Sequence, residues 1–171
     1  SSFNGMTDRT IILDGLSKTY AMTGWRIGYG VMPIGLVESI SKLSTNSVSC
    51  TASFTQIAAA EAITGSQERA LEIVEEFDRR RHIIVNGLNS INGINCPMPD
   101  GAFYVFPSIK DTGMDSRVFA DKLLQDFGVA SLAGESFGEF GKGHLRFSFA
   151  NSVENIEKAL EKINQFVQSS S

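Results

Sequence analysis

Lys18 lies in a short segment whose residue types suit carbonyl chemistry. The apolar run at residues 10–13 predicts a buried strand that ends in a turn. A lysine at the end of such a strand is partly removed from water, and its neutral amine can condense with an aldehyde to form a Schiff base. Ser17 offers a hydroxyl and Arg26 a planar, bidentate guanidinium, and both suit a phosphate group. This segment is therefore predicted to hold both ends of a phosphorylated cofactor.

The same residues match two nucleotide-binding motifs only superficially. A nucleotide phosphate-binding loop needs Gly-Lys before its Ser or Thr, but Ser17 stands where that glycine should be. Gly28 and Gly30 lack the third glycine of a dinucleotide-binding fingerprint, so they are interpreted as sites of close strand packing. On composition alone Lys18 would be an ordinary solvated lysine. The pattern of residues around it favours the cofactor interpretation instead.

The segment around Lys18 is predicted to be a loop between two strands. The return strand is expected at residues 25–32, which makes residues 15–24 the loop. A helix is expected from Ser53, where Gln56 suggests a capping box, to about residue 64. A longer helix is predicted from residue 66 to about 90. Its apolar residues at helical spacing are Leu71, Val74, Phe77, Ile84 and Leu88.

The last part of the chain predicts a second compact unit in which strands and helices alternate. Turn-forming residues at 92–101 mark its beginning. The expected strands are residues 102–107, 129–132 and 145–149, and the expected helices are 116–127 and 152–167. Asn151 and Glu154 can form a capping box for the last helix. The chain as a whole is therefore expected to be α/β.

Composition excludes several classes of function. The net charge of -4 and the pI near 5.2 provide no basic surface for nucleic acid or for an anionic membrane. No apolar run is long enough for a membrane-spanning helix, and the N-terminus does not have the pattern of a signal peptide. Cys50 and Cys96 suggest neither a disulfide framework nor a metal site, so we expect reduced thiols in a cytoplasmic protein.

The contiguous stretch at residues 17–28 reads Ser17-Lys18-Thr19-Tyr20-Ala21-Met22-Thr23-Gly24-Trp25-Arg26-Ile27-Gly28. This stretch resembles the signature of the class I and II (fold type I) pyridoxal-phosphate aminotransferases. The resemblance implies that Lys18 forms the Schiff base with pyridoxal 5'-phosphate and moves the proton during transamination. It also implies that Ser17 and Arg26 bind the cofactor phosphate. Some members of the family carry a serine three residues before the lysine, and this chain has Gly15 there.

Segments further along the chain resemble the same family in the same order. Residues 101–104 are similar to a glycine-aromatic strand that borders the substrate, and residues 128–138 to the loop that follows the next helix. Residues 143–150 are similar to the segment whose arginine binds the substrate α-carboxylate, which implies that role for Arg146. In a strand, Arg146 would face away from Leu145 and Phe147, where a bidentate guanidinium suits a carboxylate. His144 is interpreted as a polar neighbour. Asn46, Ser47 and Ser49 are expected in a loop near a neighbouring subunit's cofactor.

The resemblance implies a fold and a division into domains. Residues 1–65 would be the end of the large PLP-binding domain, residues 66–90 an interdomain helix, and residues 91–171 the small α+β C-terminal domain of fold type I enzymes. The implied function is transfer of an amino group between an α-amino acid and a 2-oxo acid, by a homodimer that binds neither nucleic acid nor membrane nor metal. The chain covers under half of the family's length, so the partner of the pyridine nitrogen is expected elsewhere and the fragment alone is expected to be inactive.

Two other functions fit the same residues. A PLP-dependent lyase or synthase on the same fold would share Lys18, Arg26 and Arg146 and differ only in the fate of the substrate. A noncatalytic truncated domain could reuse the small-domain scaffold without turnover. Half-reactions with an amino acid and a 2-oxo acid would separate transfer from release of ammonia, and these functions stay open as alternatives.

Overall fold

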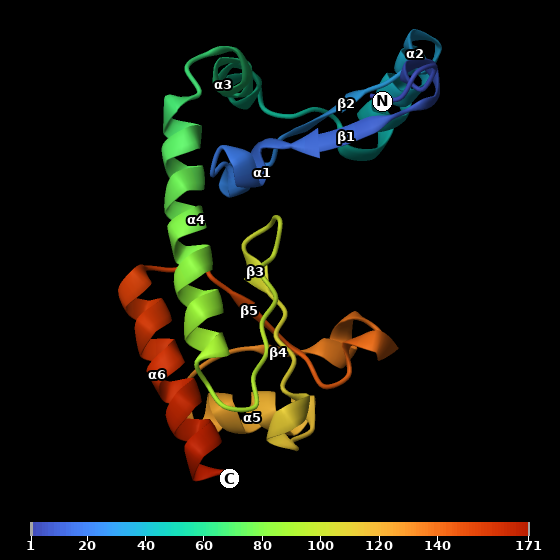
Figure 1. The fold of residues 1–171 in the computed structure, drawn as a ribbon. Coiled ribbons are helices and arrows are strands. Elements are labelled where there is room, and N and C mark those ends of the chain that lie inside the picture. The colour runs from blue at the N-terminus through green and yellow to red at the C-terminus, as the bar shows by residue number, and fades with distance from the viewer. Residues whose placement is uncertain (1, 171) are drawn as a thin grey trace. The chain divides into compact units, whose positions relative to one another are not determined.

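The computed structural model describes residues 2–170, which belong to two compact α/β units (Figure 1). The first unit is Ser1–Glu72 and the second is Ile73–Ser171. The boundary between the units falls inside the long helix α4, Glu68–Asn89, which the sequence predicted at residues 66–90. Among the described residues, no helix has the length and apolar character needed to cross a membrane.

The first unit contains one two-stranded sheet and three α-helices that precede α4. Strand β1, Ile12–Gly15, pairs antiparallel with β2, Gly28–Val31. The connection contains the single-turn helix α1, Leu16–Thr19, and the 3-10 turn Thr23–Trp25. The chain continues with α2, Ile34–Val48, and α3, Ser53–Thr64. A further 3-10 turn, Thr7–Arg9, precedes the sheet.

The prediction of a buried strand before Lys18 was wrong for this chain. Every residue of β1 except the half-buried Gly15 is exposed, and the Leu13 side chain is 79% exposed. The buried apolar cluster of the unit is small and consists of Leu16, Met22 and Ala59. A two-stranded sheet has few neighbours to cover its faces, so apolar strand residues stay in contact with solvent here.

The helices of the first unit required two further corrections. Helix α2 was not predicted, and it places Asn46 and Ser47 in its last turn instead of in the expected loop. The predicted capping box of α3 was also wrong, because the cap residue is Ala52 and no side chain caps the helix. The Gln56 side chain instead donates a hydrogen bond to the Thr51 carbonyl.

The second unit is a three-stranded antiparallel sheet with three α-helices. The strand order is β3-β5-β4, with β3 at Tyr104–Val105, β5 at Leu145–Ser148 and β4 at Leu132–Ala133. Helix α5 is Ser116–Phe127 and helix α6 is Val153–Ser169, and both lie near the C-terminal half of α4 in Figure 1. Three 3-10 turns complete the unit, at Lys110–Thr112, Gly134–Phe137 and Glu139–Gly141.

The core of the second unit forms around β5 and the inner faces of the helices. Leu145, Phe147 and Phe149 are buried, while Arg146 is half-buried and Ser148 is exposed, which confirms the predicted alternation. The buried apolar residues that pack together include Ile84, Val85 and Leu88 of α4, Phe119 and Leu123 of α5, and Ile156, Ile163 and Phe166 of α6. Leu71 and Val74, predicted for the apolar face of α4, are exposed.

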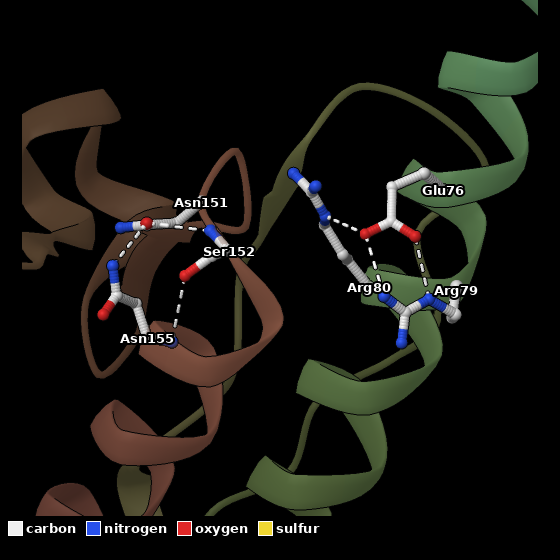
Figure 2. Close-up of polar contacts among 6 residues, drawn as sticks. All are labelled: Glu76, Arg79, Arg80, Asn151, Ser152 and Asn155. Carbon is white, nitrogen blue, oxygen red and sulfur yellow. Dashed lines mark hydrogen bonds and ion pairs between the residues drawn. The ribbon is translucent and has the colours of Figure 1, made fainter.

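The ends of α5 and α6 show why these helices were easy to locate. The Asp115 carboxylate accepts hydrogen bonds from two backbone N–H groups at the start of α5, and Gly128 ends the helix in the left-handed conformation. Helix α6 is capped by Ser152, whose Oγ accepts from the Asn155 N–H at 3.3 Å (Figure 2). The predicted capping box of Asn151 and Glu154 was therefore wrong. The Asn151 amide oxygen accepts from Ser152 and Asn155 instead.

A three-residue ion-pair cluster on α4 gives a prediction for the dependence of stability on pH. Figure 2 shows both guanidinium groups turned toward the Glu76 carboxylate, with Nε–O distances of 2.8 Å for Arg79 and 2.7 Å for Arg80. The hydrogen bonds from Arg79, and then from Arg80, lower the pKa of Glu76 from 4.5 to about 2. Because the folded pKa lies below the unfolded one, the stabilisation is complete above pH 4.5 and is lost as the pH falls toward 2.

Glu76→Gln is therefore expected to lower the melting temperature at pH 7 by about 1–3 °C, since exposed ion pairs contribute little. The difference from the wild type should shrink as the pH falls from 4.5 toward 2, as measured by thermal unfolding followed by circular dichroism. Glu75→Gln, one residue earlier on the exposed side of α4, is the control and should have no comparable effect. A Glu76→Gln difference that does not change over this pH range would contradict the assignment.

Candidate active site

The loop that carries Lys18 is closed at its base by the β1–β2 pair. Gly15 lies opposite Gly28 in the register, and the Leu16 N–H donates to the Ile27 carbonyl at 3.4 Å. Ser17 follows Leu16, and Arg26 precedes Ile27, so each lies one residue inside this closure. The pairing thus brings the hydroxyl-bearing and guanidinium-bearing residues to the same mouth of one loop.

Within the loop the backbone is more ordered than predicted. Lys18 belongs to α1, whose turn continues through the hydrogen bonds Tyr20 N–H to Leu16 and Ala21 N–H to Lys18. Ala21 and Arg26 both adopt φ of +53°, a left-handed conformation that side-chain-bearing residues rarely take. Non-glycine residues in this conformation are held there by their surroundings and cluster at functional sites. The two strained positions lie on either side of the 3-10 turn Thr23–Trp25.

Arg26 is anchored by one nitrogen and lines a cavity with its neighbours. Its Nη1 donates to the Thr23 carbonyl at 2.9 Å. The cavity has a volume of about 710 Å³, and Trp25 and Phe54, whose rings meet edge to face, also line it. Lys18 and Ser17 are not among the residues that line this cavity. Lys18 is exposed and Ser17 is half-buried.

The two glycines of β2 are closely packed, as their interpretation predicted. A Cβ on Gly28 would lie 2.8 Å from the Asp14 carbonyl oxygen, and one on Gly30 would lie 2.9 Å from the Met32 Cε. At Gly28 the obstacle is backbone of the paired strand, which cannot rotate away. Gly28 therefore keeps β1 and β2 close together at the base of the loop that carries Lys18.

Gly28→Ala is expected to destabilise the protein by about 1–3 kcal/mol, because the added methyl group would push the two strands apart. Denaturant unfolding measures this loss. Gly35→Ala in the first turn of α2 is the matched control, since nothing lies within 4 Å of its added Cβ. The control should be neutral or slightly stabilising, as alanine favours a helix over glycine. Equal unfolding midpoints for the two variants would contradict the close approach at Gly28.

Arg146 lies in the second unit, on β5, between two aromatic rings. Its Cζ is 4.4 Å from the centre of the Tyr104 ring and 4.5 Å from the centre of the Phe137 ring. No carboxylate of residues 2–170 forms an ion pair with it, so a structural ion pair at a sheet edge does not account for this arginine. His144 stacks on Phe106 with ring centres 5.3 Å apart. Phe137 as a neighbour of Arg146 was not predicted from the sequence.

The residues of the first unit fit a phosphorylated aldehyde by their chemistry. The loop offers a primary amine, a hydroxyl and a guanidinium, and the Nη2 of Arg26 takes no part in the bond to Thr23. Gly15, three residues before Lys18, has no side-chain donor, and its backbone N–H donates to the Asp14 carboxylate at 2.7 Å. Over residues 2–170, no group of three or more His, Cys, Asp or Glu side chains is arranged to hold a metal ion.

Comparisons with known proteins relate the sequence and fold of this chain to one family. The model of the family "Aminotransferase class I and II" matches residues 2–163. An aspartate aminotransferase of Pyrococcus abyssi is 39% identical, over 98% of this chain and 43% of that protein. An aromatic-amino-acid aminotransferase of Thermococcus litoralis is 37% identical, over 98% of this chain and 43% of that protein.

A solved structure of the aspartate aminotransferase from Rhizobium meliloti superposes with a TM-score of 0.91 at 36% identity, over 97% of this chain and 44% of that chain. The chain thus spans under half the length of the relatives that it matches. Both the sequence and the fold of the described residues agree with the resemblance seen around Lys18. The chain belongs to the aminotransferase class I and II family.

Proposed function

We propose that the complete protein containing this chain transfers an amino group between an α-amino acid and a 2-oxo acid, with pyridoxal 5'-phosphate as cofactor. Members of the family use this cofactor. The observation that supports the proposal most is the closed loop, in which the β1–β2 pair brings Ser17 and Arg26 to one mouth and Lys18 follows Ser17 in α1. A phosphorylated aldehyde requires an amine for its carbonyl and polar groups for its phosphate, and this one loop carries both.

Four residues have distinct roles in this proposal: Lys18, Ser17, Arg26 and Arg146. The Lys18 amine would bond to the aldehyde carbon of the cofactor and, when free, would accept and return the substrate proton. Ser17 donates one hydrogen bond to the phosphate, and Arg26 binds it with the part of its guanidinium that is not anchored to Thr23. Arg146 binds the substrate α-carboxylate. The cofactor itself supplies the electron-withdrawing ring that makes the substrate α-proton acidic.

The division into domains and the assembly belong to the same proposal. Residues 1–65 would form part of the large PLP-binding domain, residues 66–90 the interdomain helix, and residues 91–171 the small domain. We propose a cytoplasmic homodimer. The first unit exposes apolar side chains that the rest of the protein or a second subunit would cover, among them Ile34, Leu43, Val48, Phe54 and Ile57. The chain spans under half the length of its relatives. The 171-residue chain alone is therefore expected to have no aminotransferase activity.

Half-reactions of the complete protein test this function. The relatives are named for aspartate and for aromatic amino acids, so L-aspartate and L-phenylalanine are the first substrates to try. With the cofactor bound, an amino acid should shift the visible absorbance band, and a 2-oxo acid should restore it without release of ammonia. Release of 2-oxo acid and ammonia from the amino acid alone would favour the lyase. Absence of any spectral change with either amino acid or with a wider set would contradict the proposed function.

A further inference from the structure

The guanidinium of Arg146 is confined from both sides of its strand. Strand β5 is the central strand of the sheet, with β3 on one side and β4 on the other. Tyr104 comes from β3, and Phe137 comes from the turn that directly follows β4. The two rings thus reach Arg146 from opposite flanks of β5, each with its centre about 4.5 Å or less from Cζ. Rings at this distance attract the cation and limit its rotation.

The loop that carries Phe137 is closed by a contact between two glycines. Residues 134–141 begin and end at Gly134 and Gly141, whose backbones lie so close that a Cβ on either would overlap the other. The Gly134 N–H also donates to the His144 carbonyl at 2.8 Å, directly before β5. Inside the loop, the Gly138 N–H bonds to Glu135 and the Gly141 N–H bonds to Gly138. The loop is therefore fixed to the strand that carries Arg146.

A buried hydroxyl joins the two ends of the same loop. Ser116, which is fully buried at the start of α5, donates to the Glu135 Oε1 at 2.5 Å. Its oxygen accepts from the Gly143 N–H at 3.1 Å. Glu135 is the residue after the first glycine of the loop, and Gly143 lies two residues after the second. Phe137, although 51% exposed, is thus held in place by the backbone on both sides of it.

We propose that Phe137 is a positioning residue that, together with Tyr104, holds the guanidinium of Arg146 ready for the carboxylate of the substrate. With a ring on each flank, the open approach for an anion is the N–H edge of the guanidinium, where a carboxylate forms two parallel hydrogen bonds. A group that is already fixed loses less freedom on binding. This inference rests on the proposed function, because it takes Arg146 as the carboxylate-binding residue.

The test compares four variants of the complete, cofactor-loaded protein, one of which, Arg146→Lys, tests the carboxylate-binding role itself. Phe137→Leu removes the ring but keeps an apolar side chain, and Phe137→Tyr keeps the ring. Phe140→Leu is the matched control, because Phe140 lies in the same loop and is 92% exposed. Binding of two unreactive carboxylates, succinate and 3-phenylpropanoate, is measured by calorimetry, together with the concentration dependence of the amino-acid half-reaction. Thermal unfolding checks that each variant is folded.

Phe137→Leu is expected to weaken carboxylate binding about three- to tenfold. It should raise the half-saturating amino-acid concentration by the same factor, with the limiting rate and the melting temperature unchanged. Phe137→Tyr and Phe140→Leu should both stay within about twofold of the wild type. If Phe137→Leu behaves like Phe140→Leu while Arg146→Lys weakens binding, only the role of Phe137 is overturned. If Arg146→Lys also binds like the wild type, the proposed role of Arg146 falls, and this inference falls with it.

Discussion

Replacing Lys18 with alanine is expected to lower the turnover of the complete protein by at least about 10⁴-fold, because it removes the bond to the cofactor and the group that moves the proton. The loss should appear in both half-reactions. Lys18→Arg should be nearly as inactive, since a guanidinium stays charged and does not condense with an aldehyde. Stopped-flow absorbance measures both effects.

The matched control for Lys18 is Lys42→Ala in helix α2 of the same unit. It removes one exposed lysine and should leave both half-reactions within about twofold of the wild type, as surface substitutions usually have small effects. Lys18→Ala is expected to retain part of its non-covalent affinity for the cofactor, because Ser17 and Arg26 remain. A Lys18→Ala protein that keeps more than a few per cent of the wild-type rate would contradict the assigned role.

Replacing Arg146 with lysine is expected to lower kcat/KM about 100-fold, because the ammonium group cannot form two parallel hydrogen bonds to a carboxylate. Most of the loss should appear as a higher KM for the amino acid, and the cofactor should still bind. The effect on folding should be small, because Arg146 is half-buried and forms no ion pair with any described residue. Steady-state kinetics with L-aspartate and L-phenylalanine measure the change.

The control for Arg146 is Arg117→Lys, an exposed arginine of α5 in the same unit. It is also a substitution of lysine for arginine, but at a position away from β5. Its kcat/KM should stay within about twofold of the wild type. An Arg146→Lys protein with an unchanged KM would show that another group binds the carboxylate. A large loss of thermal stability in Arg146→Lys would instead indicate a structural role for this arginine.

The second unit was the part of the fold that the sequence predicted best. Its helices bury regular apolar stripes and have clear end signals, so α5 was predicted at its exact bounds and α6 to within two residues at its C-terminal end. Strand β5 showed the predicted alternation, because one face packs on the core and the other is open. The error at the start of α6 was local. Asn151 and Ser152 are neighbouring polar residues that could each cap the helix, and Ser152 does so.

The first unit was harder to predict because packing within the described chain determines little of it. Helix α2 is rich in serine and threonine, which favour turns, and it has no buried residue. The signal that could have located it is the spacing of Ile34, Val37 and Ile40 directly after a proline. The strand before Lys18 has the apolar residues of a buried strand, yet its side chains are exposed in a two-stranded sheet.

The candidate site was predictable as residues but not as geometry. The contiguous motif at residues 17–28 identified the family without any structure, because it is long and specific. The left-handed backbone of Ala21 and Arg26 and the placement of Phe137 beside Arg146 depend on hydrogen bonds and contacts between distant residues. Phe137 and Arg146 meet only because β4 and β5 pair, and no local pattern indicates that pairing.

Reductive trapping of the cofactor is the most direct test of the central claim, that Lys18 is the residue that bonds to pyridoxal phosphate. The complete protein is loaded with the cofactor, reduced with borohydride, digested and mapped by mass spectrometry. The account predicts that the added mass is found on the peptide containing Lys18, and that an amino acid added before reduction prevents the labelling. Labelling confined to another lysine, or no stable label in a protein whose cofactor band is visible, would contradict the account.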